Sequence, residues 1–491
     1  MKNIKREIYV KIESRNDDVT PSCNIATVIF PNNTTRSFMV DCGISQGESD
    51  EKAKNLFYDS KMLDVDFSII THNHIDHTGK FPYIVSKGFN KKIYTTHNTK
   101  KLMSTGLYNS AAIYEREITN KNEKPYFSSK DVESTLSLIE TCYFNNSLQI
   151  DSNFRITFFE NAHMLGAAYV IVQVSYPGCA TKNLFFTGDY KEENKLFKVS
   201  KFPKWLYKLK LYMICESTYG ISEEKESPHF INDVAKFLEE KKTVFIASIA
   251  QERLERILFE LKLAQDSGIL SKDYSINIDT TLGIQYLSDY RKILGDFFLP
   301  KNLHFWNKKN RQQLLFNNSP KIIIASSGMG DKGVSPLYIN NFIGDGSKAI
   351  YFTSYLAPTT LGYSLVNSDI YSNIYSTTEF SGHARFSEFI KIFAGLKIIG
   401  IFFNHGTANS KLESANKAFE TLNINFAKVL DSKTSYLLAN DTIFNLKNNI
   451  INLYNNEFLN DKKHNRGRAK TIQKYKNNTK KKRFYKSLNY C

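Results

Sequence analysis

Short apolar runs that end in polar clusters fill the first 200 residues of the chain. Residues 37–40, 66–70, 154–160 and 183–189 are rich in Val, Ile and Phe, which favour extended strands. Several such runs finish in polar letters, as in VDCG, IITHNH, FFENAH and FFTGD. Because open sheets gather sites at the carboxyl ends of their strands, we expect these polar side chains to meet at one edge.

Strands and helices alternate from about residue 208. The run at 211–217 opens this part, and the strand at 243–249 leads into an amphipathic helix over 250–268. The segment KIIIASSGMG at 321–330 predicts a strand followed by a tight turn. The alternation predicts an α/β unit with a parallel sheet. A strand, loop and helix over 398–422 follow, and the chain becomes rich in Asn and Lys from about residue 447.

The length and composition fit a globular protein of two or three structural units. The chain has 491 residues, of which 42% are apolar and 23% are charged. The N-terminal stretch has no apolar segment of the kind that secretory signals carry, and no apolar run approaches the ~20 residues of a membrane helix. We expect a soluble intracellular protein, cytoplasmic or, in a eukaryote, nuclear.

The positive charge is concentrated near the C-terminus. The formal net charge is +16, and residues 461–491 hold twelve Lys or Arg against one acid, which leaves about +5 for the rest. Such a tail is typical of polyanion binding, with solubility or targeting as alternatives. The six cysteines form no CxxC pair, which fits a reduced compartment.

The segment HNHIDH places four metal-binding side chains within six residues. His72, His74, Asp76 and His77 follow a strand-like run, and a tight loop there can direct all four side chains at one point. Imidazole nitrogen and carboxylate oxygen are ligands of borderline cations such as zinc. Three more candidates each follow an apolar strand and are expected to converge on the same place: His163, Asp189 and His405.

These residues and their order resemble the metallo-β-lactamase superfamily. The segments ESTYG at Glu216, FSGHA at His383 and FNHG at His405 are similar to three further motifs of its β-CASP nuclease branch. That branch includes the cleavage subunit of the mRNA 3′-end processing machinery and bacterial ribonuclease J. The segments SSGMG at 326–330 and SYLAPTTLG at 354–362 also resemble family segments, so the likeness covers roughly residues 5–440.

The resemblance implies an α/β fold, in which a metallo-β-lactamase αββα sandwich carries an inserted α/β β-CASP cap domain. The expected boundaries are 1–207 for the first part of the metallo-β-lactamase domain and 208–380 for the β-CASP domain. Residues 381–446 would complete the metallo-β-lactamase domain, and 447–491 would form the basic tail.

The resemblance also implies two zinc ions per chain. One ion would be held by His72, His74 and His163. The other would be held by Asp76, His77 and His405, and Asp189 would bridge the two ions. Asp41 would orient the ligands without binding metal. A water between the ions, acidified to hydroxide near neutral pH, would attack phosphorus.

Further residues acquire roles from the same resemblance. Asp76 and Asp189 count among the catalytic residues, and His383 would bind a phosphoryl oxygen or protonate the leaving oxygen while Glu216 orients it. Substrate contacts are implied for Ser327, Gly328, Met329, Ser381 and His383. The chain departs from the family pattern at Arg385, where many members carry an acid, and at 249–252 and 279–283.

The motifs favour a zinc-dependent ribonuclease that hydrolyses single-stranded RNA in RNA processing or decay. His405 favours RNA over DNA, because DNA-acting members typically carry an apolar residue there. A DNA nuclease of the same fold and a non-catalytic RNA-binding scaffold subunit stay open as alternatives. The expected partner is RNA and not a membrane. A homodimer or a place in a processing complex, and internal or stepwise 5′ cleavage, also stay open.

Overall fold

The computed structural model describes residues 7–45, 55–118, 124–222, 229–368, 370–439 and 441–446. Contacts separate Met1–Asn445 from Leu446–Cys491, and the fold described below belongs to the first unit. The basic tail expected at 447–491 lies outside the described residues. Among the described helices, none is both long and apolar enough to cross a membrane.

Two mixed sheets form one of the two parts of the fold, the sandwich. In spatial order, the eight-stranded sheet consists of β21 (Thr442–Asn445), β20 (Ser435–Ala439), β1 (Tyr9–Ser14), β2 (Asn24–Ile29), β3 (Thr35–Val40), β4 (Phe67–Ile69), β5 (Ile93–Thr96) and β6 (Ile139–Cys142). The seven-stranded sheet consists of β19 (Phe426–Val429), β18 (Lys397–Asn404), β11 (Lys210–Glu216), β10 (Lys182–Phe186), β9 (Ala168–Val174), β8 (Phe154–Glu160) and β7 (Ser147–Gln149).

The side chains of the two sheets share one core. Phe38 and Phe67 of the larger sheet pack in the same cluster as Phe154 and Leu184 of the smaller one. Strand side chains alternate between faces, so the neighbouring Phe185 points to the opposite side of β10 and joins a second cluster. Burial on both faces explains why these strands are almost continuously apolar.

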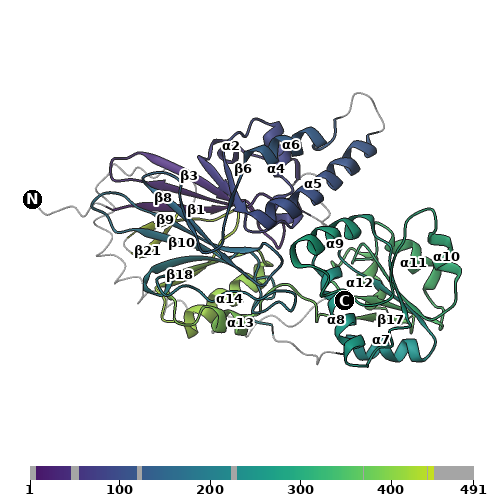
Figure 1. The fold of residues 1–491 in the computed structure, drawn as a ribbon. Coiled ribbons are helices and arrows are strands. Elements are labelled where there is room, and N and C mark those ends of the chain that lie inside the picture. Colours follow the sequence, from purple (N-terminus) through teal and green to yellow (C-terminus); the bar gives the residue numbers. More distant parts are fainter. Residues whose placement is uncertain are drawn as a thin grey trace, which may run out of the picture. The chain divides into compact units, whose positions relative to one another are not determined.

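Helices cover the outer faces of both sheets, as Figure 1 shows. On the larger sheet these are α2 (Ser60–Asp64), α4 (Phe81–Ser86), α5 (His97–Glu117) and α6 (Ser129–Leu138). On the smaller sheet they are α13 (Phe386–Ile392) and α14 (Ala408–Thr421). The resulting four layers, helix–sheet–sheet–helix, confirm the sandwich expected from the sequence.

A parallel sheet forms the second half of the fold. Its order is β14 (Leu303–Phe305), β13 (Ser275–Ile278), β15 (Lys321–Ala325), β12 (Thr243–Ala247), β16 (Lys348–Phe352) and β17 (Ile374–Ser376), with every pair parallel. One face carries α7 (Phe230–Glu239), α8 (Arg253–Asp266) and α9 (Thr281–Leu294). The other face carries α10 (Arg311–Phe316), α11 (Ser335–Phe342) and α12 (Leu361–Val366). The expected α/β unit with a parallel sheet is therefore present.

The strand β11 belongs to the sandwich and not to this α/β unit. It pairs in parallel with β10 on one side and with β18 on the other. The run at 211–217 was expected to open the α/β unit at residue 208, and that expectation is wrong, because an apolar strand does not reveal its partners. By strand pairing, we place the start of the inserted part after Glu216.

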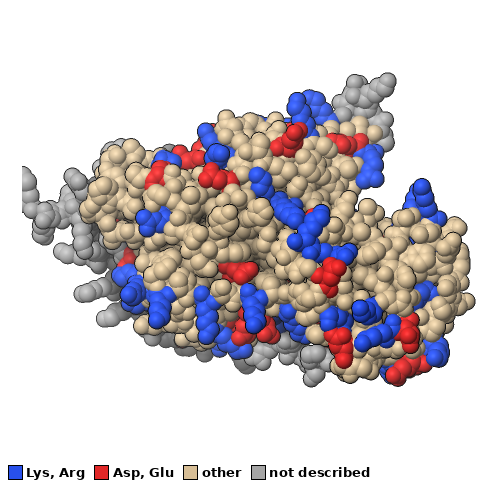
Figure 2. Space-filling view, in the orientation of Figure 1, with Lys and Arg blue, Asp and Glu red and all other residues tan. Residues whose placement is uncertain are grey.

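Charged side chains of both signs lie along one margin of the sandwich. In Figure 2 Lys and Arg side chains lie along the lower edge of the view, with Asp and Glu side chains among them.

Candidate metal centre

Strand ends bring the predicted ligands together. His72 lies three residues beyond β4, and His74 begins α3 (Ile75–Thr78), the single turn that carries Asp76 and His77. From the opposite sheet come three residues that follow β8, β10 and β18: His163, Asp189 and His405. The convergence expected from their shared strand-end position is what the structure shows.

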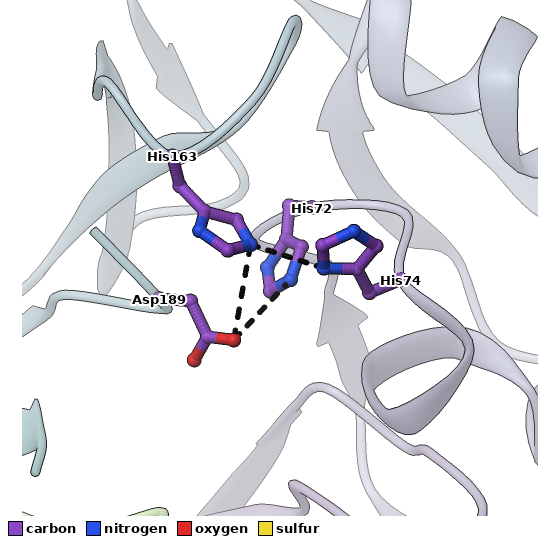
Figure 3. A group of neighbouring side chains, drawn as sticks. All are labelled: His72, His74, His163 and Asp189. Carbon is purple, nitrogen blue, oxygen red and sulfur yellow. Dashed lines mark hydrogen bonds and ion pairs between the residues drawn. The ribbon is translucent and has the colours of Figure 1, made fainter. Parts of the chain in front are cut away.

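The first group contains His72, His74, His163 and Asp189 (Figure 3). Their ligand atoms all lie within 4.8 Å of one another. His163 Nε2 is 3.0 Å from His74 Nδ1, and Asp189 Oδ2 is 3.6 Å from His72 Nε2 and 3.9 Å from His163 Nε2.

The second group contains Asp76, His77, His405 and the same Asp189. His77 Nε2 lies 3.2 Å from Asp189 Oδ2 and 3.1 Å from His405 Nε2. His405 Nε2 lies 3.4 Å from Asp76 Oδ2. Asp189 is thus common to both groups, which is the position required of a bridging carboxylate.

The side chains fit a pair of borderline cations. His72 Nε2 and Asp189 Oδ1 are buried and have no hydrogen-bond partner, an arrangement that is costly for polar atoms unless something else satisfies them. Both atoms belong to the two groups, whose imidazole and carboxylate donors are those that zinc prefers. Among the described residues, seven side chains would hold the two ions.

Asp41 holds the ligand-bearing segment after β4 in place through contacts with Thr71 and His77. Its carboxylate accepts hydrogen bonds from the Thr71 backbone N–H and hydroxyl at 2.8 Å each, and its Oδ2 lies 2.8 Å from His77 Nδ1. The segment after β3, which carries Asp41 and Gly43, passes α3 so closely that a Cβ on Gly43 would lie 1.6 Å from the Asp76 carbonyl oxygen. Only glycine fits at position 43. Asp41 contacts Nδ1 of His77, which leaves Nε2 directed at the other ligands.

Burial sets the protonation of the first group. It lowers the pKa of His72 and His163 well below the usual value, and that of His74 to about 4. Neutral imidazoles are the form that binds metal. Burial also lowers the pKa of His77, but Asp189, Asp41 and Asp76 outweigh it and raise that pKa well above its usual value.

His383 lies beside the ligands and is paired with Glu216. Its Nδ1 is 3.2 Å from Glu216 Oε1 and 3.8 Å from Asp189 Oδ2, and its side chain is 24% exposed. Backbone N–H groups of Tyr190 and Thr218 donate to the Glu216 carboxylate at 3.3 and 3.1 Å. Burial would lower the pKa of His383, but Glu216 and then Asp189 outweigh it and raise it to about 10.

The predicted substrate residues fall in two places. Ser381 lies next to His383, whose backbone N–H donates to the Ser381 hydroxyl at 3.2 Å. Ser327, Gly328 and Met329 form the turn after β15, where a Cβ on Gly328 would come within 2.4 Å of Ser354 Oγ.

Two supporting residues were not predicted from the sequence. Asn161 donates to the Asp189 carbonyl at 3.0 Å and accepts from the His163 backbone N–H at 3.0 Å, so it ties two ligand loops together. The Thr218 hydroxyl lies 3.2 Å from His405 Nδ1. Asn161 lies within the segment FFENAH and Thr218 within ESTYG, and this membership is the sequence signal that could have singled them out.

Comparison with known proteins gives two family matches. The β-CASP domain family matches residues 254–365, and the anti-Pycsar protein Apyc1 family matches residues 24–207.

Curated relatives extend the likeness along the chain. The transcription termination factor FttA of Methanococcus maripaludis is 25% identical over 469 residues, 86% of this chain and 72% of the relative. The FttA of Thermococcus kodakarensis is 30% identical over 325 residues, 61% of this chain and 48% of the relative. The endoribonuclease ysh1 of Aspergillus fumigatus is 32% identical over 189 residues, 38% of this chain and 21% of the relative.

Among solved structures, the metallo-β-lactamase fold protein YhfI of Bacillus subtilis matches with a TM-score of 0.25 and 13% identity, over 44% of this chain and 74% of that one. A TM-score this low supports no argument about the fold, which rests on the sheets themselves.

Proposed function

We propose that this chain, which carries a β-CASP domain and is similar to the β-CASP nucleases of the metallo-β-lactamase superfamily, is a zinc-dependent ribonuclease that hydrolyses single-stranded RNA. The family resemblance expected from the motifs is confirmed, and with it the class of metal-dependent hydrolases. The similarity to FttA and ysh1 supports a role in RNA processing. Zinc, the single-stranded substrate and the individual residue roles are our proposals.

The observation that carries the proposal is the sharing of Asp189 by three groups of side chains. It belongs to both candidate ligand groups and also to the group formed with Glu216 and His383. Two groups that could hold cations, and a third that pairs His383 with Glu216, therefore share one carboxylate. Hydrolysis of a phosphodiester uses such an arrangement, because charge grows on several oxygens at once in the transition state.

When bound, two zinc ions would supply Lewis acidity for the phosphoryl oxygens and lower the pKa of a water that attacks phosphorus. The protein side chains do the rest. Asp189 holds the two ligand groups in register, and Asp41 fixes the tautomer and direction of His77 through Nδ1. Glu216 keeps His383 oriented, so that its ring can donate a hydrogen bond to a phosphoryl oxygen or a proton to the leaving oxygen.

His405 is one reason to propose RNA as the substrate, because DNA-acting members of the family typically carry an apolar residue at this position. It lies within hydrogen-bonding distance of Thr218 and close to Asp76 and His77, so its ring is set among the ligands of the second group. The presence of all seven ligand side chains argues against a non-catalytic scaffold.

The test is incubation of the zinc-loaded chain with end-labelled RNA bearing different 5′ groups, alongside DNA strands of the same sequence. We expect RNA cleavage by the parent and none by Asp189→Ala, since its carboxylate serves both ligand groups. Asp296→Ala is the matched control, because that carboxylate is 61% exposed in an ion pair with Arg291. Equal cleavage by Asp189→Ala and the parent would overturn the proposed centre, and faster cleavage of DNA would reassign the substrate.

A further inference from the structure

Tyr355 stands exposed at the carboxyl edge of the parallel sheet. It follows β16 and leaves 64% of its surface exposed, while Ile249, beyond β12, leaves 41% exposed. The strands β15, β12 and β16 are neighbours, with Ala247 opposite both Ala325 and Phe352. The segments that follow the three strands therefore begin at the same level, on the edge where ligands of parallel sheets bind.

Close packing joins these three segments. A Cβ on Gly328 would lie 2.4 Å from Ser354 Oγ and 3.0 Å from the backbone nitrogen of Ile249. The Arg253 guanidinium donates to the Thr353 carbonyl and so fixes the start of the loop that carries Tyr355. Tyr355 is thus an exposed ring on a backbone anchored beside the turn at 327–329.

A cationic side chain, Arg385, lies two residues after His383. The ring of Tyr219 meets the ring of His383 edge to face, with 6.2 Å between centroids. The guanidinium carbon of Arg385 lies 4.9 Å from the Tyr219 centroid, and Arg385 Nη1 donates to the Ser222 carbonyl at 3.2 Å. Arg256, one turn after Arg253 in α8, donates to the Phe380 and Ser381 carbonyls at 3.0 and 3.3 Å, so the same helix holds the loop that carries Tyr355 and the segment that carries His383 and Arg385.

We propose that Tyr355 and the Arg385–Tyr219 pair form a subsite for one nucleotide of single-stranded RNA adjacent to the scissile phosphate. Tyr355 stacks on the base, and Arg385 contacts the phosphate of that nucleotide. The subsite rests on the proposed ribonuclease function and specifies its substrate. An exposed ring offers its face to any base, and only an unpaired base can present a whole face in return. The planar guanidinium, stacked on Tyr219, keeps N–H groups directed for a phosphate.

The test is steady-state cleavage of a short RNA by the full, zinc-loaded chain. Tyr355→Ala should raise KM about tenfold with little change in kcat, because loss of one base–ring stack costs that order of affinity. Tyr355→Phe keeps the ring and should match the parent. Tyr143→Ala is the control for an exposed tyrosine elsewhere, since Tyr143 is 76% exposed between β6 and β7. Arg385→Ala should lower the slope of log KM against log salt by about 0.7, the value for one phosphate on a single strand.

A second set of substrates identifies the stacked base. One abasic ribose is moved through the nucleotides next to the cleaved bond. At a single position it should raise the KM of the parent about tenfold and leave the KM of Tyr355→Ala unchanged. Equal KM values for the parent and Tyr355→Ala, or an equal abasic penalty in both proteins, would overturn the subsite while RNA cleavage persists. Absence of RNA cleavage by the parent would overturn the ribonuclease function and the subsite with it.

Discussion

Glu216 Oε1 lies 3.2 Å from Nδ1 of His383, although the two residues are 167 positions apart in the chain. Glu216 ends β11, and His383 lies in the segment before α13. Each comes from a different side of the inserted α/β part, so the pair forms only when the chain has returned to the sandwich. We propose for His383 a role distinct from that of the ligand histidines, because it lies outside both ligand groups and is paired with Glu216.

His383→Ala should lower the rate of RNA cleavage on the order of a hundredfold or more, because a proton donor or phosphate contact is lost. The zinc content should stay unchanged, since His383 lies outside both ligand groups. Cleavage rates and elemental analysis on the same preparation measure the two effects. A variant that loses zinc would make His383 a ligand and contradict the assignment.

Glu216→Gln should give a milder defect than His383→Ala, because the amide keeps the shape but not the charge that orients the ring. The double variant should be hardly slower than His383→Ala alone, since Glu216 acts through His383. The three rates are compared under one set of conditions. Multiplied defects in the double variant would show that the two residues act independently.

Asp41→Asn should weaken zinc binding about 10- to 100-fold, the range found when a partner of a ligand is lost. The carboxylate contacts His77 and both donors of Thr71, and the amide can accept at only one of its two ends. Competition with a zinc chelator measures the affinity. Asp66→Asn is the matched control, since Asp66 accepts the Ser37 backbone N–H at an exposed place in the same sheet. Equal affinities in both variants would remove Asp41 from the centre.

Glu255 should make stability depend on pH. It is fully buried in α8, and burial, reinforced by Glu252, raises its pKa well above 4.5. The folded chain therefore keeps a proton that the unfolded chain loses. The contribution of Glu255 to stability is complete below pH 4.5 and falls as the pH rises towards the folded pKa.

Glu255→Gln should be more stable than the parent at pH 8, with the difference shrinking as the pH falls towards 4.5. Glu260→Gln is the control on the same helix. Its side chain is 21% exposed and forms an ion pair with Lys195, whereas Glu255 is fully buried. Thermal unfolding at several pH values measures the difference. A parent that matches Glu255→Gln at every pH would show that Glu255 is ionised when folded.

Removal of the residues after Phe458 should weaken RNA binding and flatten its salt dependence, because residues 461–491 carry twelve Lys or Arg. The melting temperature of the remaining chain should not change, since the tail has little apolar content to bury. Binding titrations at several salt concentrations measure the slope. Identical slopes with and without the tail would assign its charge to targeting or solubility.

The sequence predicted the centre best where ligands are dense. His72, His74 and His77 stand out locally. His163 and His405 are single histidines, which became candidates through their place after apolar strands and were assigned to ligand sets through the order of the motifs. The sheet to which β11 belongs could not be predicted from the sequence, because its pairing with β10 and β18 depends on segments far away in the chain. The stacking of Arg385 on Tyr219 could not be predicted either, since a contact across 166 positions leaves no local sequence pattern.

Zinc titration into chelator-stripped protein, followed by cleavage of labelled RNA, tests the two-metal account most directly. Seven ligand side chains in two groups predict that cleavage is absent without metal, rises with added zinc and reaches its plateau near two equivalents per chain. RNA cleavage that is unaffected by removal of the metal, or a chain that binds two zinc ions and leaves RNA intact, would contradict it.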